Sequence, residues 1–179
     1  DVTDESADES TGLDELPELL AVLVAEFREG GIEATLVPEA VGAPAQIVVP
    51  IPDADRHLRI NTFFLPDVDD PPVVQYFVTL PYSVDPERVD SLARLLCMLN
   101  ANLPLTGFEL SERNEAVVFR HTHAISVRPL DPGVIAWTWA MIRSAVVEFG
   151  SLVERSAGGL GFEDAAAAVD AAFATIVDD

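Results

Sequence analysis

The spacing of apolar residues predicts four helices. Near the start of the chain, apolar side chains recur every three or four residues up to Phe27, which is the period of an amphipathic helix, and Gly30-Gly31 supplies a C-terminal stop. Two further helices have clear starts, because Asp85 and Asp131 can each cap an N-terminus and are each followed by proline. The predicted helices run from about 14 to 29, from 86 to about 100, from 132 to about 155, and from 162 to 177.

Alternation of apolar and polar residues predicts strands between these helices. In residues 57–65, Leu58, Ile60 and Phe64 share one face, while polar side chains occupy the other. Further strands are predicted at 32–37, 46–51, 73–80, 106–111 and 116–123, with an acidic, turn-rich loop at 66–72. Because successive strands lack crossover helices, we expect an α+β fold: an antiparallel sheet of about five to six strands with helices packed on one face.

A single domain is expected from the length of 179 residues. Residues 1–12 are rich in acids and poor in apolar side chains, so they predict a disordered acidic tail. Residues 13–179 then form one α+β domain. Within it, the segment 158–179 is predicted to be an accessory, alanine-rich helix joined by a glycine-rich hinge.

The charge of the chain narrows the set of partners. There are 31 acidic residues against 10 basic ones, all of them arginine, for a formal net charge of −21. Nucleic acids and anionic membranes are polyanions, so we expect neither as a partner. No apolar run approaches the ~18–20 residues of a membrane span. The single cysteine, Cys97, cannot form an internal disulfide, which favours a reducing, cytoplasmic location.

The three histidines are the best candidates for metal binding. His121 and His123 are two residues apart, so their imidazoles share one face of a strand, and His57 is the candidate third ligand. The same face carries Val117 and Phe119, which favours a second interpretation, histidines at the edge of the core. We expect no metal, and a metal-binding protein or metal-dependent enzyme remains the alternative.

Motifs that would support catalysis are missing from the sequence. Acid pairs such as Asp69-Asp70 lie in predicted proline-rich turns. General acid–base catalysis needs a carboxylate whose pKa is shifted by burial in a cleft, and an exposed turn does not provide that. The glycine-rich segment Gly158–Gly161 follows a predicted helix rather than a strand, and no lysine or hydroxyl residue completes a phosphate-binding loop. We therefore predict that the protein is not an enzyme and has no cofactor.

The helix predicted from residue 132 is apolar on two sides. Trp139 belongs to the expected core stripe, and Trp137 points about 200° away from it, so the two cannot face the same core. Either the last helix covers this second stripe, or a second subunit or client segment does. Aromatic and methionine side chains are favoured at protein interfaces. The candidate partner-binding residues are therefore those of the second stripe: Val134, Trp137, Met141 and Ala145.

The stretch Leu99–Glu109 (LNANLPLTGFE), followed by Val117–Arg120 (VVFR), resembles the YbjN family. The similarity covers about residues 85–155, and the helix-then-strands order before it is also similar. Members of that family resemble type III secretion chaperones in fold. The resemblance implies a small acidic α+β protein, often a homodimer, that binds protein rather than converting a substrate. It supplies no catalytic residues.

The motif residues are expected to have structural roles. Leu103-Pro104 ends a helix and forces an extended start to the next strand, while Gly107 allows a close approach or a bulge there. These observations predict a cytoplasmic, non-enzymatic protein-binding module, chaperone-like or regulatory, that forms a homodimer. A small-ligand-binding domain, with a pocket between the sheet and the helices, is the remaining alternative.

Overall fold

The computed structural model describes residues 16–53, 56–69, 72–111, 115–125 and 131–177. These residues form one six-stranded antiparallel sheet with the strand order β1-β2-β3-β4-β6-β5. The predicted acidic tail, residues 1–12, lies outside the described residues. The strands are β1 (Thr35–Val37), β2 (Gln46–Pro50), β3 (Arg59–Asp69), β4 (Pro72–Ser83), β5 (Phe108–Ser111) and β6 (Ala116–Ala124).

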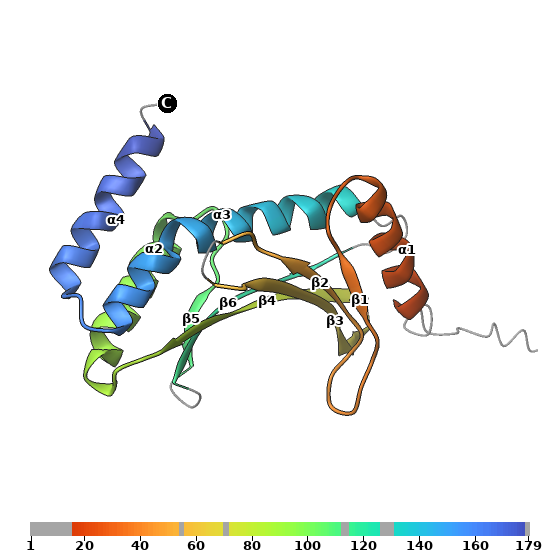
Figure 1. The fold of residues 1–179 in the computed structure, drawn as a ribbon, viewed down its shortest axis with the longest axis horizontal. Coiled ribbons are helices and arrows are strands. Elements are labelled where there is room, and N and C mark those ends of the chain that lie inside the picture. Colours follow the sequence, from red (N-terminus) through yellow and green to blue (C-terminus); the bar gives the residue numbers. More distant parts are fainter. Residues whose placement is uncertain (1–15, 54–55, 70–71, 112–114, 126–130, 178–179) are drawn as a thin grey trace, which may run out of the picture.

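The helices all lie on one face of this sheet, which confirms the predicted α+β architecture (Figure 1). The two predicted capping residues, Asp85 and Asp131, begin the 3-10 turn that precedes α2 and the helix α3. The Oδ1 atom of Asp85 accepts a hydrogen bond of 2.9 Å from the Glu87 amide, and that of Asp131 accepts one of 2.8 Å from the Gly133 amide. The helical elements are α1 (Leu16–Glu29), the 3-10 turn η1 (Pro86–Arg88), α2 (Val89–Asn102), α3 (Pro132–Ala157) and α4 (Phe162–Val177).

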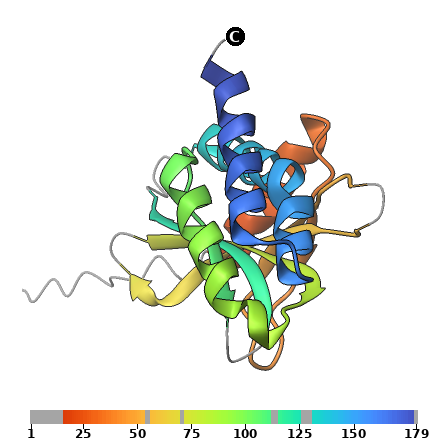
Figure 2. The same cartoon turned by 90° about the vertical axis from the view of Figure 1, so that its left-hand side faces the viewer.

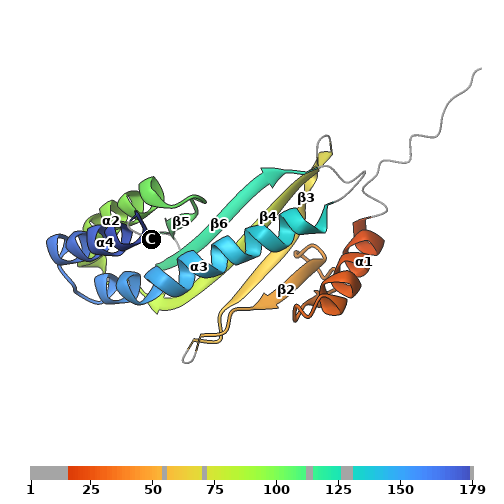
Figure 3. The same cartoon turned by 90° about the horizontal axis from the view of Figure 1, so that it is seen from above.

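Helix α3 is the main support of the core. It runs lengthwise across the sheet, with α1 near its N-terminal half and α2 and α4 near its C-terminal end (Figure 3). Its predicted core stripe is buried against the sheet, and Trp139 is only 4 % exposed. The centroids of the Trp139 ring and the Phe27 ring of α1 are 4.5 Å apart. The Nε1 atom of Trp139 donates a 2.8 Å hydrogen bond to the Thr62 hydroxyl in β3. One side chain thus joins α1, α3 and the sheet.

The motif that suggested the family resemblance joins α2 to β5. The Asn100 side chain accepts hydrogen bonds from the amides of Gly107 and Phe108 and donates one to the Phe108 carbonyl. Leu103 is extended, with φ −78° and ψ 140°, and follows the last residue of α2 as predicted. A Cβ atom on Gly107 would lie 2.4 Å from a ring carbon of Phe119, so this glycine allows the predicted close approach.

Two strand predictions were wrong in their bounds. Residues 66–69 extend β3 and Pro72 begins β4, so most of the predicted loop at 66–72 is strand. The pairing register shifts between Phe64 and Asp69, and an irregular register tolerates a proline that cannot donate a ladder hydrogen bond. The predicted strand at 32–37 begins only at Thr35. Before it, the Ile32 amide donates a hydrogen bond to the Phe27 carbonyl, and the Arg28 side chain donates one to the Ala34 carbonyl, so these groups are not available for strand pairing.

Candidate protein-binding surface

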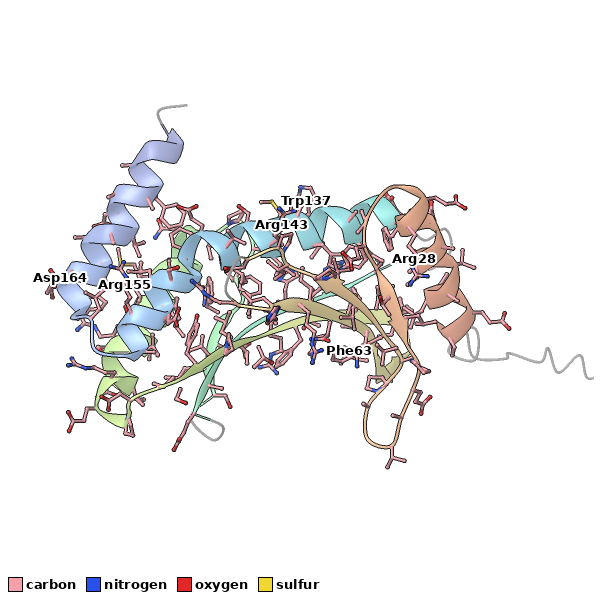
Figure 4. The ribbon with its side chains drawn as sticks, viewed as in Figure 1. Arg28, Phe63, Trp137, Arg143, Arg155 and Asp164 are labelled. Atoms are coloured by element: carbon pink, nitrogen blue, oxygen red, sulfur yellow. The ribbon has the colours of Figure 1, made fainter. Side chains whose placement is uncertain are left out.

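The second apolar stripe of α3 is uncovered in its N-terminal half. Val134 is 40 % exposed and Trp137 is 54 % exposed, and Met141 one turn later is half-buried. The positions recur at three- and four-residue intervals, so they share one flank of the helix. Trp137 lies on the side of α3 that points away from the sheet (Figure 4). Ala145, the fourth predicted residue, is only 5 % exposed.

The C-terminal half of the stripe is covered within the chain. Leu152, which lies two helical turns beyond Ala145 on the same flank, is buried. Helix α4 packs beside α2 and α3 at this end of the molecule (Figure 2). The Phe173 ring of α4 stacks on Phe149 of α3 with 5.2 Å between ring centroids. The last helix therefore packs against this end of α3, and the described residues leave Val134 and Trp137 exposed at the other end.

A groove of about 740 Å³ continues from the exposed stripe toward α4. Its walls are the end of α2 with the chain that follows it, the middle of α3, and the end of α4. Met141 and Ala145 line it, which brings two of the predicted residues into one hollow. Its other described lining residues are Asn102, Leu103, Pro104, Leu105, Ser144, Glu148, Phe149, Ala172 and Phe173. Glu148 is the one ionisable side chain among them.

The sequence did not reveal this groove, because it depends on how three separate segments meet. The apolar pair Leu103 and Leu105 was the one feature of the sequence that could have indicated the groove. Both residues follow the end of a helix and flank a proline, where a solvent-exposed connection is usually polar. In the fold they are half-buried and form the wall opposite α3.

The structure brings together two of the three candidate metal ligands. His121 and His123 lie on the helix-facing side of β6, with 5.6 Å between their ring centroids. His57 lies elsewhere. Tyr76 pairs with His121 on one side and with Thr62 on the other, so Thr62 is level with His121 in the sheet. His57 precedes Thr62 by five residues, which places it roughly 16 Å further along the chain. Among the described residues, no group of three His, Cys, Asp or Glu side chains is close enough to hold a metal ion.

The two histidines pack against buried Tyr76 instead. The His123 ring stacks on Tyr76 at 5.6 Å, and its Nε2 atom is buried without a hydrogen-bond partner among the described residues. The Nδ1 atom of His121 lies 3.3 Å from the Thr106 carbonyl. Burial lowers the pKa of His123 below its ordinary value of 6.5, and the neighbouring His121 adds to this shift. Burial also raises the pKa of Tyr76, with Thr138 acting in the opposite direction.

These contacts predict a pH-dependent contribution to stability. Because the folded-state pKa of His123 lies below its unfolded value, the unfolded chain binds the proton more readily. The contribution is therefore complete above pH 6.5 and is lost as the pH falls from 6.5 toward the folded pKa. We expect the urea midpoint of the wild-type protein to decline more steeply between pH 7 and about 5 than that of His123→Gln. Parallel pH profiles of the two proteins would contradict this assignment.

A second hollow lies on another flank of α3. It has a volume of about 330 Å³ between the end of α1, the end of β2 and α3. Trp139 and Ile60 contribute apolar surface, while Glu33 and Arg143 supply opposite charges. If the protein binds a small ligand, as in the alternative hypothesis, this hollow is a candidate site for it.

Comparison with known proteins bears on the fold alone. No family model matches the sequence, and no curated protein matches it. Among solved structures, the chain is similar to YbjN, a proposed transcription regulator from E. coli, with a TM-score of 0.52 and 12% sequence identity. The match covers 75% of this chain and 91% of that chain. The chain therefore has a YbjN-like fold.

The YbjN-like fold confirms the resemblance drawn from the motif at 99–120. At 12% sequence identity the likeness concerns the fold and does not extend to function. Among the described helices of this YbjN-like chain, none combines the length and the apolar character that crossing a membrane requires.

Proposed function

We propose that the protein is a non-enzymatic binding module that takes up an apolar segment of another protein along α3. The contact surface consists of Val134, Trp137 and Met141, and continues into the groove floored by Ala145. The observation that carries this proposal is the exposed Trp137 beside an apolar groove. An exposed aromatic side chain next to a concave apolar surface is the usual form of a binding hot spot.

The energy available at Trp137 is large enough to anchor a partner. A tryptophan side chain buries roughly 200–250 Å² when fully covered, and about half of that remains exposed here. Covering this half removes about 120 Å² from water, which is worth about 3 kcal/mol at ~25 cal/mol per Å². Met141 adds a flexible side chain that adapts to partners of different shape.

The partner best suited to this surface is a basic amphipathic helix. A helix can place apolar side chains at i, i+3, i+4 and i+7 along the stripe and into the groove. Its basic residues would be attracted by the net charge of −21 and by Glu148 in the groove wall. The role would be chaperone-like or regulatory in a cytoplasmic setting. The description of YbjN as a proposed transcription regulator agrees with a regulatory role.

The proposal can be tested with designed peptides. One peptide carries leucine at helical spacing with arginine at the remaining positions, and a matched peptide carries glutamate in place of arginine. We expect the basic peptide to bind the full-length protein, and to bind at least tenfold more weakly to Trp137→Asp. Its affinity should also fall as salt is raised, because ionic screening weakens the attraction. Isothermal titration calorimetry measures both effects.

Val147→Asp is the matched control on the same helix. Val147 is 43 % exposed and lies ten residues beyond Trp137, which turns it by about 80° to another flank. The peptide should bind this variant as it binds the wild-type protein. Equal binding to Trp137→Asp and wild type, or preference for the acidic peptide, would refute the proposal.

A further inference from the structure

No described helix covers the face of the sheet opposite α3, here called the bare face, and this face is apolar at its centre. Phe63 lies on this side (Figure 4), and strand alternation places Phe77 there as well. The two are diagonal neighbours, because Phe63 pairs with Gln75 and Asn61 pairs with Phe77. The half-buried apolar residues of this face do not belong to the core that packs under the helices: Val48, Phe63, Leu65, Val73 and Phe77.

Three polar side chains of this bare face have partners within the sheet. The Asn61 amide donates a hydrogen bond of 3.3 Å to the Phe77 carbonyl, which turns it toward the backbone. Arg120 forms a bidentate pair with Glu109, with its Nε 3.0 Å from Oε1 and its Nη2 2.5 Å from Oε2. A second surface can therefore cover the centre without stripping these groups of their partners.

The charge of the bare face differs from that of the whole chain. Among the strand residues whose side chains are described, it carries one acid, Glu109, and two bases, Arg59 and Arg120. The chain as a whole has a net charge of −21. Two copies that meet through this face keep most of their acidic residues apart. Contact through any acid-rich surface would add like-charge repulsion.

We propose that two copies of the chain pack face to face through the bare sheet, forming a symmetric dimer. Six strands about 4.8 Å apart span about 24 Å, and strands of about six residues are ~20 Å long. The flat footprint is therefore about 500 Å² per copy before side-chain relief, or about 1,000 Å² for the two copies together, at the lower end of specific interfaces. A two-fold axis through the centre of the face would place the Phe63 and Phe77 cluster of each copy near that of the other.

The described side chains of this face are nearly neutral in sum and apolar at the centre, which favours a second copy over other occupants. A basic partner would be drawn to the acid-rich remainder of the molecule and would meet Arg59 here. An acidic partner would be repelled by the net charge of −21. The dimer leaves the α3 surfaces of both copies on its two outer sides. It therefore stands independently of the proposed binding of a partner by α3.

Analytical ultracentrifugation of the full-length protein tests the dimer directly. We expect reversible dimerisation that strengthens between about 0.05 and 0.5 M salt, because the Debye length falls and the repulsion between two chains is screened. Phe63→Glu and Phe77→Glu should each raise the dimer dissociation constant at least tenfold. Neither phenylalanine belongs to the buried core, so circular dichroism and the unfolding temperature should remain close to wild type.

Trp137→Asp is the control on the opposite side of the molecule, and it should dimerise as the wild-type protein does. A wild-type protein that stays monomeric at every concentration and at both salt levels would overturn the proposal. It would also be overturned by folded Phe63→Glu and Phe77→Glu variants that dimerise normally, or by loss of the dimer in Trp137→Asp. Failure of the peptide experiment would leave these outcomes unchanged, since the two surfaces lie on opposite sides of the sheet.

Discussion

Replacing Trp139 with alanine is expected to lower the free energy of unfolding by about 4 kcal/mol. The ring is 4 % exposed, packs on Phe27 and donates to the Thr62 hydroxyl, so its removal leaves a cavity and an unpaired buried hydroxyl. Because the side chain joins α1, α3 and β3, no single element can move to fill the space. Urea denaturation followed by circular dichroism measures the loss.

Trp137→Ala provides a matched control two residues away. The same chemical change at a side chain that is 54 % exposed should alter the free energy of unfolding by less than about 0.5 kcal/mol. Similar losses in the two variants would mean that the two sides of α3 are not divided between core and surface as described. The comparison separates the structural tryptophan from the one proposed to bind a partner.

Gly107→Ala is expected to destabilise the protein by about 2–3 kcal/mol through overpacking. The added Cβ would lie 2.4 Å from a ring carbon of Phe119, which is fully buried and packs edge-on against Phe108 at 5.0 Å. The Phe119 ring therefore has little freedom to move aside. The same group of contacts includes the Asn100 hydrogen bonds, so strain here also loosens the start of β5. The midpoint of thermal unfolding measures this effect.

Gly30→Ala is the control for this substitution. A Cβ at Gly30 meets the Phe27 carbonyl oxygen at 3.4 Å, an ordinary contact, so the change in stability should be small. A Gly107→Ala protein as stable as Gly30→Ala would show that β5 and β6 can separate at this point. The close approach would then not explain why glycine occupies position 107.

Local signals in the sequence were sufficient for the helices. The Asp85-Pro86 and Asp131-Pro132 starts gave the correct first turns, because capping depends on a carboxylate and the adjacent amides alone. The alternation in residues 57–65 gave the correct buried face of β3, because neighbouring side chains of a strand point to opposite faces. The length of β3 was missed because Pro66 and the acids near it resemble a loop. Pairing with β4, a non-local interaction, extends the strand to Asp69.

The candidate site was predictable only in part. Two apolar stripes on α3 could be recognised from spacing, but the exposed half of the second depends on where α4 folds back. The groove beside Met141 needs the chain after α2, which local patterning cannot place. The bare face was implied by helices on one side of a sheet. Its apolar centre and charge became visible only when the strand register brought Phe63 near Phe77.

Fluorescence of Trp137 during titration with the basic amphipathic peptide is the most direct test of the central claim, that the exposed flank of α3 binds a partner. In a Trp139→Phe variant, Trp137 is the sole tryptophan, since the chain has two. We predict that its emission shifts to shorter wavelength in proportion to the peptide bound, because the exposed ring is removed from water. Peptide binding that saturates while the emission of Trp137 stays unchanged would contradict the account.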